Sequence, residues 1–493
     1  MSIKKSKQIA LFVDLDGTLI TGDTLYESVI LLIKRYPLKT FSLLCWITKG
    51  RAFLKHKVAQ LIIPEPSLLQ YKEDVIGYIN KEKNNGRDVY LLSAANKKIA
   101  ESVAGYLGIF KKVYGSTAKI NLLGKEKLKR IRNIVGNNQF EYMGDSKNDI
   151  PIWSATSSGA AIDPNRGLKK RIRKFDNIKM INTMKKKAIF KSIIKEIRIH
   201  QWAKNLLLFL PIIMAHQFTE TKIVISVFWA FISFSFCASA MYVLNDLLDI
   251  ETDIAHPSKQ HRPLASGEMS IKLGVFLIIG LIIISFSIVV STLSTSFLII
   301  LIIYIMLTTA YSFILKQIML IDVIVLGGLY TLRIGAGSVA SGVGVSSWLL
   351  VFSMFFFLSL AFMKRYADLI LMRENNKGKI AGRDYHLEDL DLVQKSGITS
   401  GFVAMLVLAL YINSAHVIGL YKSPILIWFT VPVLLYWLMR MWMVTNRGKM
   451  TEDPIIFALR DKITYISMFI IVVIMLLAAI IDNSMFNNLN IIQ

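Results

Sequence analysis

Hydrophobic residues follow two different patterns along the chain. In about the first 165 residues, short apolar runs alternate with glycine turns and charged stretches of helical period, which is typical of a soluble α/β domain. Beyond about residue 200, apolar runs of about 20 residues recur, and each is long enough to cross a bilayer as a helix. The pattern predicts a soluble domain followed by an all-α polytopic membrane bundle of about nine helices. The expected spans are 202–217, 224–244, 271–291, 295–315, 319–340, 347–366, 398–419, 425–444 and 462–481.

Composition supports this division. Of the 493 residues, 54% are hydrophobic, and the mean hydropathy is +0.49. The formal net charge is +24, and much of it lies in 166–204, directly before the first expected span, where a basic stretch meets anionic lipid at the cytoplasmic face. No nucleic-acid-binding motif accompanies this charge, so we expect a bilayer rather than a nucleic acid as the partner. The expected domains are 1–165 and 198–493, joined by a basic juxtamembrane linker at 166–197.

Lysine and arginine are distributed unevenly among the expected loops. The three long polar loops, 245–270, 367–397 and 445–461, are rich in them, whereas the opposite loops carry little beyond Lys222 and Lys422. By the positive-inside rule, the long loops and the soluble domain face the cytoplasm of a multi-pass protein of the cell (inner) membrane. Any catalytic chemistry of the membrane domain is therefore expected in the long loops.

The two cysteines predict neither a disulfide nor a metal site. Cys45 falls in the soluble region and Cys237 inside an apolar run, so a bond between them is not expected. Neither has the spacing of a metal ligand. The oligomeric state stays open, including a homo-oligomer.

Two acids follow a short apolar run near the N-terminus, in QIALFVDLDGTLI. The run is too short for a signal peptide and predicts a strand that ends at Asp14 and Asp16. Because alternate residues of an extended segment point the same way, both carboxylates can face one site. One can attack a phosphorus atom, and the other can protonate the leaving group. Gly17 allows the chain to turn away.

Three further segments supply matching chemistry. RDVYLLSAANK predicts a strand that ends at Ser93, which is placed to hydrogen-bond phosphoryl oxygens. NLLGKEKLKRI supplies Lys127, or alternatively Lys125, to neutralise the charge of the transferring group. FEYMGDSKNDIPIW predicts a third strand followed by Asp145 and Asp149, and such acids suit Mg²⁺.

These four motifs, in this order, resemble the haloacid dehalogenase (HAD) superfamily over about residues 8–165. The resemblance implies a Rossmann-like phosphatase domain with a small helical cap at about 20–85. It implies that Asp14 is the nucleophile, which forms an aspartyl-phosphate, and that Asp16 is the acid/base. The other implied roles are phosphate contact for Thr18 and Ser93, charge neutralisation for Lys127, and Mg²⁺ binding by Asp14, Asp16, Asp145 and Asp149. An ordinary α/β domain and a HAD domain that has lost its activity are the alternatives.

A dense charged cluster, NDLLDIETDIAHPSKQHRP, directly follows the second expected span. Asp246, Asp249 and Asp253 are spaced three and four apart, so on a helix they share one face. At the C-terminal end of a span they oppose the helix dipole and repel one another, and a divalent cation would remove both penalties. Mg²⁺ with a diphosphate is therefore the expected ligand, and Lys259 and Arg262 can reach the same phosphates. A solvated acidic loop is the alternative.

Further charged and aromatic residues lie at the cytoplasmic ends of the expected spans. Arg333 lies within a span, and an ionisable residue there is a functional-site hypothesis by default. Each alone is explained more simply by snorkelling or an interface role. As a set at one end of a bundle they favour a polyanion site, and Gly335 and Gly337 would let helices approach closely. The set comprises Lys204, Tyr311, Lys316, Arg333, Lys364 and Arg365, with Asp368, Asp453, Arg460 and Asp461 as further candidates. Asp322 either belongs to this site or faces another helix.

The pattern NDxxDxxxDxxHPxKxxRPLASG, with QWxKN before it, resembles the UbiA superfamily of intramembrane transferases over about 198–482. Quinone-type prenyltransferases of that superfamily carry a second acid-rich motif after the sixth span. Here that place reads KRYADLILMRENN, with Asp368 and Glu374 as its acids and two bases in front. Together with YSFILK, LRIGAG and FALRD, this resembles the decaprenyl-phosphate phosphoribosyltransferase branch. By that resemblance Asp246, Asp249 and Asp253 hold Mg²⁺-diphosphate, Asn245, Lys259 and Arg262 support it, and Tyr311, Lys316, Arg333, Lys364 and Arg365 hold the other phosphates.

The resemblance implies transfer of 5-phosphoribosyl from phosphoribosyl diphosphate (PRPP) to a polyprenyl, decaprenyl-like phosphate, with release of diphosphate. The fused phosphatase would then remove the 5-phosphate of the product. Two other classes stay open: a prenyltransferase acting on an aromatic or haem-like acceptor, and a transporter or membrane scaffold that carries a HAD module. Label from PRPP or from a prenyl diphosphate separates the two transferases, and a scaffold would release no diphosphate.

Overall fold

A computed structural model describes residues 9–183, 189–256, 259–374, 383–450 and 453–481. The chain forms two compact units. The first comprises the chain up to Glu196 together with Val243–Phe276, and the second comprises Ile197–Tyr242 and the chain from Leu277 onward. Within the basic stretch expected as a linker, residues 184–188 lie outside the described part of the chain.

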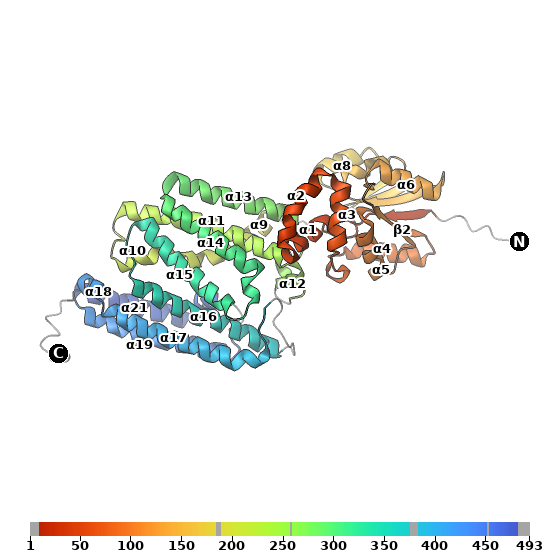
Figure 1. Ribbon diagram of the computed structural model, residues 1–493. Helices are drawn as coiled ribbons and strands as arrows, with labels where there is room; N and C mark the ends of the chain where they lie inside the picture. Colours follow the sequence, from red (N-terminus) through yellow and green to blue (C-terminus); the bar gives the residue numbers. More distant parts are fainter. Residues whose placement is uncertain (1–8, 184–188, 257–258, 375–382, 451–452, 482–493) are drawn as a thin grey trace. The chain divides into compact units, whose positions relative to one another are not determined.

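A parallel six-stranded sheet, of which Figure 1 labels β2, forms the centre of the first unit. Its strand order is β3-β2-β1-β4-β5-β6. Successive residues of β1 point to opposite faces: Leu11 and Val13 enter one apolar cluster and Phe12 the other. The order reverses between β1 and β4, and open α/β sheets bind ligands at the carboxyl ends of the strands at such a point. This topology confirms the Rossmann-like fold expected from the motifs. The strands are β1 Ala10–Val13, β2 Val89–Asn96, β3 Lys112–Ser116, β4 Phe140–Gly144, β5 Ser158–Ile162 and β6 Ile178–Ile181.

Helices cover both faces of this sheet. On one face, α4 (Glu73–Asn84) and α5 (Lys97–Leu107) contribute to the apolar cluster around Leu11. On the other face, α6 (Lys125–Val135), α7 (Ile150–Trp153) and α8 (Arg166–Ile172) contribute to the cluster around Phe12. Part of the segment expected as a linker therefore belongs to this layered fold, because it supplies α8 and the edge strand β6.

Three helices between β1 and β2 form a small separate group, α1 (Thr24–Arg35), α2 (Thr40–Thr48) and α3 (Arg51–Leu61). They share a core of their own, made by Leu31, Leu32, Leu43, Val58 and Ile62. The sequence between these strands was expected to form a helical cap, and α1–α3 are that cap. By contrast α4, which falls in the same stretch of sequence, packs on the sheet.

Eight helices in the described part of the chain are long and apolar enough to cross a membrane, so the protein is multi-pass. The first of the nine expected spans, 202–217, is divided between a 3-10 helix, Ile199–Phe209, and the short helix α10, Leu210–Met214. Pro211 lies in the first turn of α10, where its missing N–H is tolerated. The eight are α11 Thr221–Leu248, α13 Ile271–Thr292, α14 Thr295–Phe313, α15 Ile321–Ser341, α16 Ser347–Glu374, Leu387–Ile412 with α17 Leu390–Ile412, Pro424–Asn446 with α19 Thr430–Asn446, and α21 Lys462–Ile480.

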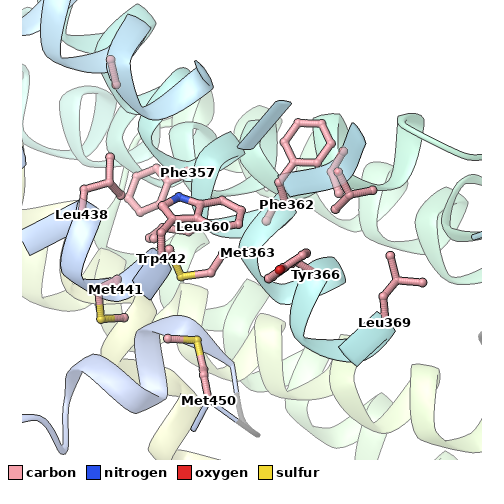
Figure 2. Close-up of a cluster of buried hydrophobic side chains, with 14 of the residues drawn as sticks. Phe357, Leu360, Phe362, Met363, Tyr366, Leu369, Leu438, Met441, Trp442 and Met450 are labelled. Carbon is pink, nitrogen blue, oxygen red and sulfur yellow. The ribbon is translucent and has the colours of Figure 1, made fainter. Parts of the chain in front are cut away.

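Large apolar side chains of α16 and α19 form the core of the second unit. Figure 2 shows this cluster, with Phe357, Leu360, Met363 and Tyr366 from α16 and Leu438, Met441 and Trp442 from α19. A Cβ at Gly397 of α17 would overlap the Trp442 ring, so this helix needs glycine to approach closely. A Cβ at Gly337 of α15 would overlap the backbone of Leu208 for the same reason, whereas one at Gly335 would meet open space. Of these two glycines, Gly337 therefore allows the close approach.

Two candidate active sites

The first candidate site lies where β1 and β4 end. Asp14 follows β1, and Asp145 and Asp149 follow β4, so the sheet brings together acids that are far apart in the sequence. One carboxylate oxygen from each lies within 4.8 Å of the others. In the described part of the chain, this is the one group of three acidic, histidine or cysteine side chains with metal-binding spacing. A set of three carboxylates suits Mg²⁺, which prefers oxygen ligands.

Lys127, in the first turn of α6, is the cation of this site. Its Nζ lies 2.6 Å from Asp14 Oδ2 and 3.7 Å from Asp149 Oδ1. Burial by itself lowers the pKa of Lys127, but the charges of Asp14 and Asp149 outweigh burial and raise it, so the amine stays protonated. Of the two lysines that the sequence left open, Lys127 is thus buried among the acids, whereas Lys125 is exposed.

Burial also governs the acids. It raises the pKa of Asp14, although the charge of Lys127 acts in the opposite direction. It raises the pKa of Asp145 well above the ordinary value, and the charge of Asp14 adds to the shift. Two buried carboxylates and the half-buried Asp145 face one lysine, which leaves excess negative charge that a bound cation would relieve.

Tyr142 orients Asp149, although no sequence motif marks it. Its hydroxyl donates to Asp149 Oδ1 at 2.7 Å and accepts from Lys127 Nζ at 3.1 Å. The other carboxylate oxygen, Oδ2, accepts from the backbone N–H and the hydroxyl of Ser146, each at 3.0 Å. Tyr142 lies within the apolar strand β4, so its pattern is that of a core residue and only the fold reveals the contact.

Asp16 is the second acid of the first motif. Its Oδ1 accepts from the backbone N–H of Thr24, at the start of α1, at 2.9 Å. Burial, and after it the charge of Asp23, raises the pKa of Asp16 to about 7. An acid with this pKa can both donate and accept a proton near neutral pH, as acid/base catalysis requires.

The loop after β1 places the remaining residues of the motif. Gly17 has φ +72°, and a Cβ there would also overlap the Asp145 carboxylate, so the position requires glycine on two grounds. The hydroxyl of Thr18 is fully buried and has no hydrogen-bond partner among the described residues. Buried polar groups are normally satisfied, so Thr18 fits a ligand oxygen. Ser93, buried in β2, accepts from the backbone N–H of Ala95 at 3.0 Å.

Two cap residues interact with the site and were missed by sequence reasoning. Glu27 of α1 is buried, and burial, followed by the charges of Asp16 and Asp23, raises its pKa to about 8. Lys55 of α3 donates to the carbonyl of Ala94 at 2.6 Å. Burial lowers the pKa of Lys55, while the charges of Asp16 and Asp23 oppose that shift. The cap carries no motif, so the one available signal was charge within helices that are otherwise apolar.

The second candidate site is formed by the acidic motif, which belongs to the first unit. Asp246 lies in α11, Asp249 links α11 to α12 (Ile250–Ile254), and Asp253 lies in α12. Helical hydrogen bonds continue across the junction, since the Asp253 N–H donates to the Asp249 carbonyl at 2.8 Å. Asp246 and Asp253 are buried and Asp249 is half-buried.

Arg262 bridges two of these acids. One guanidinium nitrogen, NH1, lies 3.0 Å from Asp246 Oδ1 and 2.5 Å from Asp253 Oδ2. Burial raises the pKa of Asp253, and the charge of Arg262 opposes the shift. The third acid contacts a different base, because Lys34 Nζ lies 3.4 Å from Asp249 Oδ1 within the same unit. Asn245 lies in α11, and Lys259 lies in a 3-10 helix, Lys259–His261.

In the second unit, three of the predicted residues are linked through two partners. Lys204 Nζ lies 2.9 Å and Lys364 Nζ lies 3.4 Å from the same oxygen of Asp453. Burial acts to raise the pKa of Asp453, but the charges of the two lysines outweigh burial and lower it, so this acid is ionised. Lys204 and Arg333 also lie over the ring of Tyr330, at 5.7 Å and 5.4 Å from its centroid. The cluster therefore holds more positive than negative charge.

Arg333 is held by neutral groups inside the bundle. Its Nε donates to the side-chain oxygen of Asn205 at 2.9 Å, and NH1 donates to the carbonyl of Leu329 at 2.6 Å. A third contact is made by NH2, which donates to the hydroxyl of Tyr304 at 3.3 Å. These contacts satisfy much of the hydrogen-bonding capacity of the guanidinium. A role in positioning Tyr330 and Asn205 therefore explains the presence of Arg333 inside the bundle as well as a phosphate contact does.

Asp322, which the sequence left unplaced, is the buried partner of Arg365. Arg365 Nε lies 2.6 Å from Asp322 Oδ2, and its NH1 lies 2.6 Å from Asp368 Oδ2. Tyr385 donates to the other oxygen of Asp322 at 2.6 Å. Tyr311 interacts electrostatically with Arg365 and Lys364. Lys316 is buried in a 3-10 helix, Leu315–Gln317.

Two solved structures match parts of the chain at low similarity. A UbiA homolog from Archaeoglobus fulgidus, bound to GPP and Mg²⁺, is 14% identical, covers 58% of this chain and 99% of its own, and has a TM-score of 0.44. A substrate-bound phosphoserine phosphatase is 18% identical, covers 36% of this chain and 94% of its own, and has a TM-score of 0.26.

Sequence relatives are closer. The protein y4nM of Sinorhizobium fredii is 32% identical over 461 residues, 93% of this chain and 89% of that protein. Nodulation protein NoeC of Azorhizobium caulinodans is 33% identical over 265 residues, 54% and 85% of the two chains. Decaprenyl-phosphate phosphoribosyltransferase of Corynebacterium glutamicum is 34% identical over 197 residues, 39% and 59% of the two chains. The UbiA prenyltransferase family model matches residues 206–470, more than half of the chain. The chain belongs to the UbiA prenyltransferase family.

Proposed function

We propose that the membrane domain transfers 5-phosphoribosyl from PRPP to a polyprenyl phosphate and releases diphosphate. The observation that carries this choice is the pair of lysines, Lys204 and Lys364, that share the single carboxylate of Asp453. PRPP and the acceptor bring a 5-phosphate and a lipid phosphate beyond the diphosphate, so their site needs surplus positive charge. The relative from Corynebacterium glutamicum is named for this activity, and this chain spans 59% of its length.

The acidic motif would bind the diphosphate. Asp246, Asp249 and Asp253 supply the carboxylate donors that Mg²⁺ prefers, and bound Mg²⁺ would neutralise the leaving diphosphate. Arg262, which bridges Asp246 and Asp253, would exchange these carboxylates for phosphate oxygens. Lys259 and Asn245 would also support the diphosphate. In the reaction, an oxygen of the acceptor phosphate bonds to C1 of the ribose as the bond from C1 to the diphosphate breaks. Because the acceptor is already an anion, no strong base is needed.

We further propose that the HAD domain is a Mg²⁺-dependent phosphatase. Asp14 attacks the phosphorus, and Asp16 protonates the leaving oxygen as its bond to phosphorus breaks. Asp16 then removes a proton from a water molecule that releases phosphate and restores Asp14. Lys127 holds the attacking carboxylate, with Nζ 2.6 Å from Asp14 Oδ2, and Thr18 and Ser93 contact the phosphoryl oxygens. Bound Mg²⁺ would supply charge neutralisation, and the trio of Asp14, Asp145 and Asp149 fits it.

The natural substrate of this phosphatase would be the polyprenyl-phosphoryl ribose 5-phosphate made by the membrane domain, and both sites would face the cytoplasm of the cell membrane. The support is the covalent link between the two domains, together with lysine-rich and arginine-rich long loops on the side assigned to the soluble domain.

The test follows label from PRPP and from a prenyl diphosphate in membranes that contain the full chain. We expect lipid labelling from PRPP, and labelling from the prenyl diphosphate alone would refute the transferase proposal. Asp249→Asn should abolish lipid labelling and leave hydrolysis of a soluble phosphomonoester intact. Asp14→Asn should leave lipid labelling intact and make the 5-phosphorylated lipid accumulate. If Asp14→Asn and the unmodified chain end at the same lipid, the proposed substrate of the phosphatase is wrong.

A further inference from the structure

Helix α2 of the cap exposes an apolar face. Leu38, just before the helix, is 84% exposed, and Phe41, Leu44 and Ile47 are 73%, 67% and 58% exposed. These residues are three apart, so they lie along one side of the helix. Leu43, on the opposite side, is buried in the core that α1, α2 and α3 share, and Trp46 packs against that core. Helix α2, labelled in Figure 1, therefore has two apolar sides. One side packs in the core of the cap, and the other is exposed.

The surroundings of this face are strongly basic. No acidic residue occurs in the sequence between Glu27 and Glu65. Of the seven lysines and arginines in this stretch, Lys34 pairs with Asp249, Arg35 pairs with Glu251, and Lys55 donates to the carbonyl of Ala94. The other four are Lys39, Lys49, Arg51 and Lys57. Several of these bases lie beside the aromatic rings that border α2. Lys39 Nζ is 4.8 Å from the Tyr36 ring centroid, and Lys49 Nζ is 5.4 Å from that of Phe53.

We infer that the exposed face of α2, formed by Leu38, Phe41, Leu44 and Ile47, inserts into the interface of an anionic lipid bilayer. Helices that bind this interface place an apolar side about 5–10 Å deep, at the boundary between headgroups and acyl chains, and surround it with bases and aromatic residues. The basic border matches the negative potential of anionic lipid. In its described part the same chain has eight helices that are long and apolar enough to cross a membrane, so the cap is covalently joined to a domain suited to a bilayer.

The charge around α2 also argues against a second copy of the chain as the partner that covers its exposed face. A symmetric contact through α2 would bring the same basic border of both copies together, and like charges at such a distance repel. Lipid headgroups would neutralise that border instead. The inference does not rest on either proposed reaction, because it concerns the attachment of the cap and not its chemistry.

Cys45 of α2 is a native site for a spin label, because its thiol is exposed whereas Cys237 is buried. We would place a nitroxide on Cys45 in the full chain carrying Cys237→Ala, reconstituted in nanodiscs. We expect collisions with oxygen, which dissolves in lipid, to exceed collisions with an aqueous nickel chelate. The excess should grow with the fraction of phosphatidylglycerol. A label on Cys45→Ser, Glu101→Cys should favour nickel in every lipid, because Glu101 is exposed on α5, away from the cap.

A second experiment repeats the measurement on Cys45 in a chain that also carries Leu44→Asp. This substitution should shift the Cys45 label toward the nickel chelate and leave hydrolysis of a soluble phosphomonoester unchanged, which shows that the cap is folded. The inference is overturned if the labels at Cys45 and Glu101 give the same ratio in every lipid. It is equally overturned if dipolar coupling shows that Cys45 labels of two copies lie side by side.

Discussion

Lys127 and Asp14 form a buried ion pair, with Nζ 2.6 Å from Oδ2 and side chains that are 1% and 9% exposed. The pair joins the end of β1 to the first turn of α6, and Asp149 is a second carboxylate 3.7 Å from the same amine. We predict that Lys127→Met abolishes hydrolysis of a phosphomonoester, because the attacking carboxylate of Asp14 then loses the lysine that holds it. It should also destabilise the sheet by about 3–5 kcal/mol, because it leaves buried acids without their cation.

Hydrogen exchange of the β1 and β4 amides in the full chain measures that loss of stability. Asp14→Asn combined with Lys127→Met should recover part of the stability and none of the activity, because it removes one of the acids that lost its partner. Unchanged protection of β1 in Lys127→Met would show that the ion pair contributes little to the fold.

The pKa of Asp16, raised from 3.8 to about 7, predicts a pH dependence of the first chemical event. Asp16 must be protonated to release the leaving group, so the burst of leaving group should be present below pH 7 and fall as pH rises through 7. Stability follows the same proton. The folded chain holds it between about pH 4 and 7 while the unfolded chain does not, so this group makes stability fall with rising pH in that window.

Asp23→Asn tests the cause of this shift. The negative charge of Asp23 raises the pKa of Asp16, second only to burial, so its removal should move the falling limb of the burst to lower pH. Asparagine also caps helices, and the side chain of Asp23 already accepts from the backbone N–H of Leu25, so the start of α1 should be preserved. A falling limb at the same pH in both proteins would contradict the assignment to Asp16.

Lys55 is predicted to bind the substrate from the cap. Its amine interacts with the charges of Asp16 and Asp23 and donates to the Ala94 carbonyl, so it borders the region where a phosphoryl group would lie. We expect Lys55→Met to reduce kcat/KM for a phosphomonoester by about 100-fold. Lys57→Met is the matched control on the same helix, since Lys57 contacts Gln60 and the Phe53 ring. Equal activity of the two variants would remove Lys55 from the site.

Lys364 is predicted to bind a phosphate of PRPP or of the acceptor. It shares Asp453 with Lys204, and a phosphate can displace it from that carboxylate more readily, because its distance of 3.4 Å is the longer of the two. Lys364→Met should raise KM for one of the two substrates by about 10- to 100-fold, as loss of a charged hydrogen bond implies. Lys395→Met, which removes an exposed lysine paired with Asp391, should leave both KM values unchanged. Steady-state labelling of lipid from PRPP measures both.

The sequence predicted those structural features that are determined by residues adjacent in the chain. Strand β1 and the acids after it were predictable because an apolar run, two acids and a glycine are adjacent in the sequence. Tyr142 was not predictable, because its role depends on contacts with Asp149 and with Lys127 of α6, which only the fold brings to it. The segment expected as a span at 202–217 is helical but divided, because length and hydropathy do not reveal that a 3-10 helix ends where α10 begins, near Pro211.

Asp322 and Arg365 illustrate the same limit within the membrane domain, and they carry the last prediction. Both side chains are fully buried and 2.6 Å apart, although they lie on different helices, α15 and α16. Asp322→Asn should destabilise the bundle by about 3–5 kcal/mol, because Arg365 and the nearby Arg383 then lack this buried acid. Arg365→Leu in the same chain should recover part of that loss, because the unpaired cation is removed. Hydrogen exchange of α15 and α16 in nanodiscs measures each variant. If the loss of stability in the double variant equals the sum of the losses in Asp322→Asn and in Arg365→Leu, the two residues are not energetically coupled. Arg365 is then held by Asp368 instead.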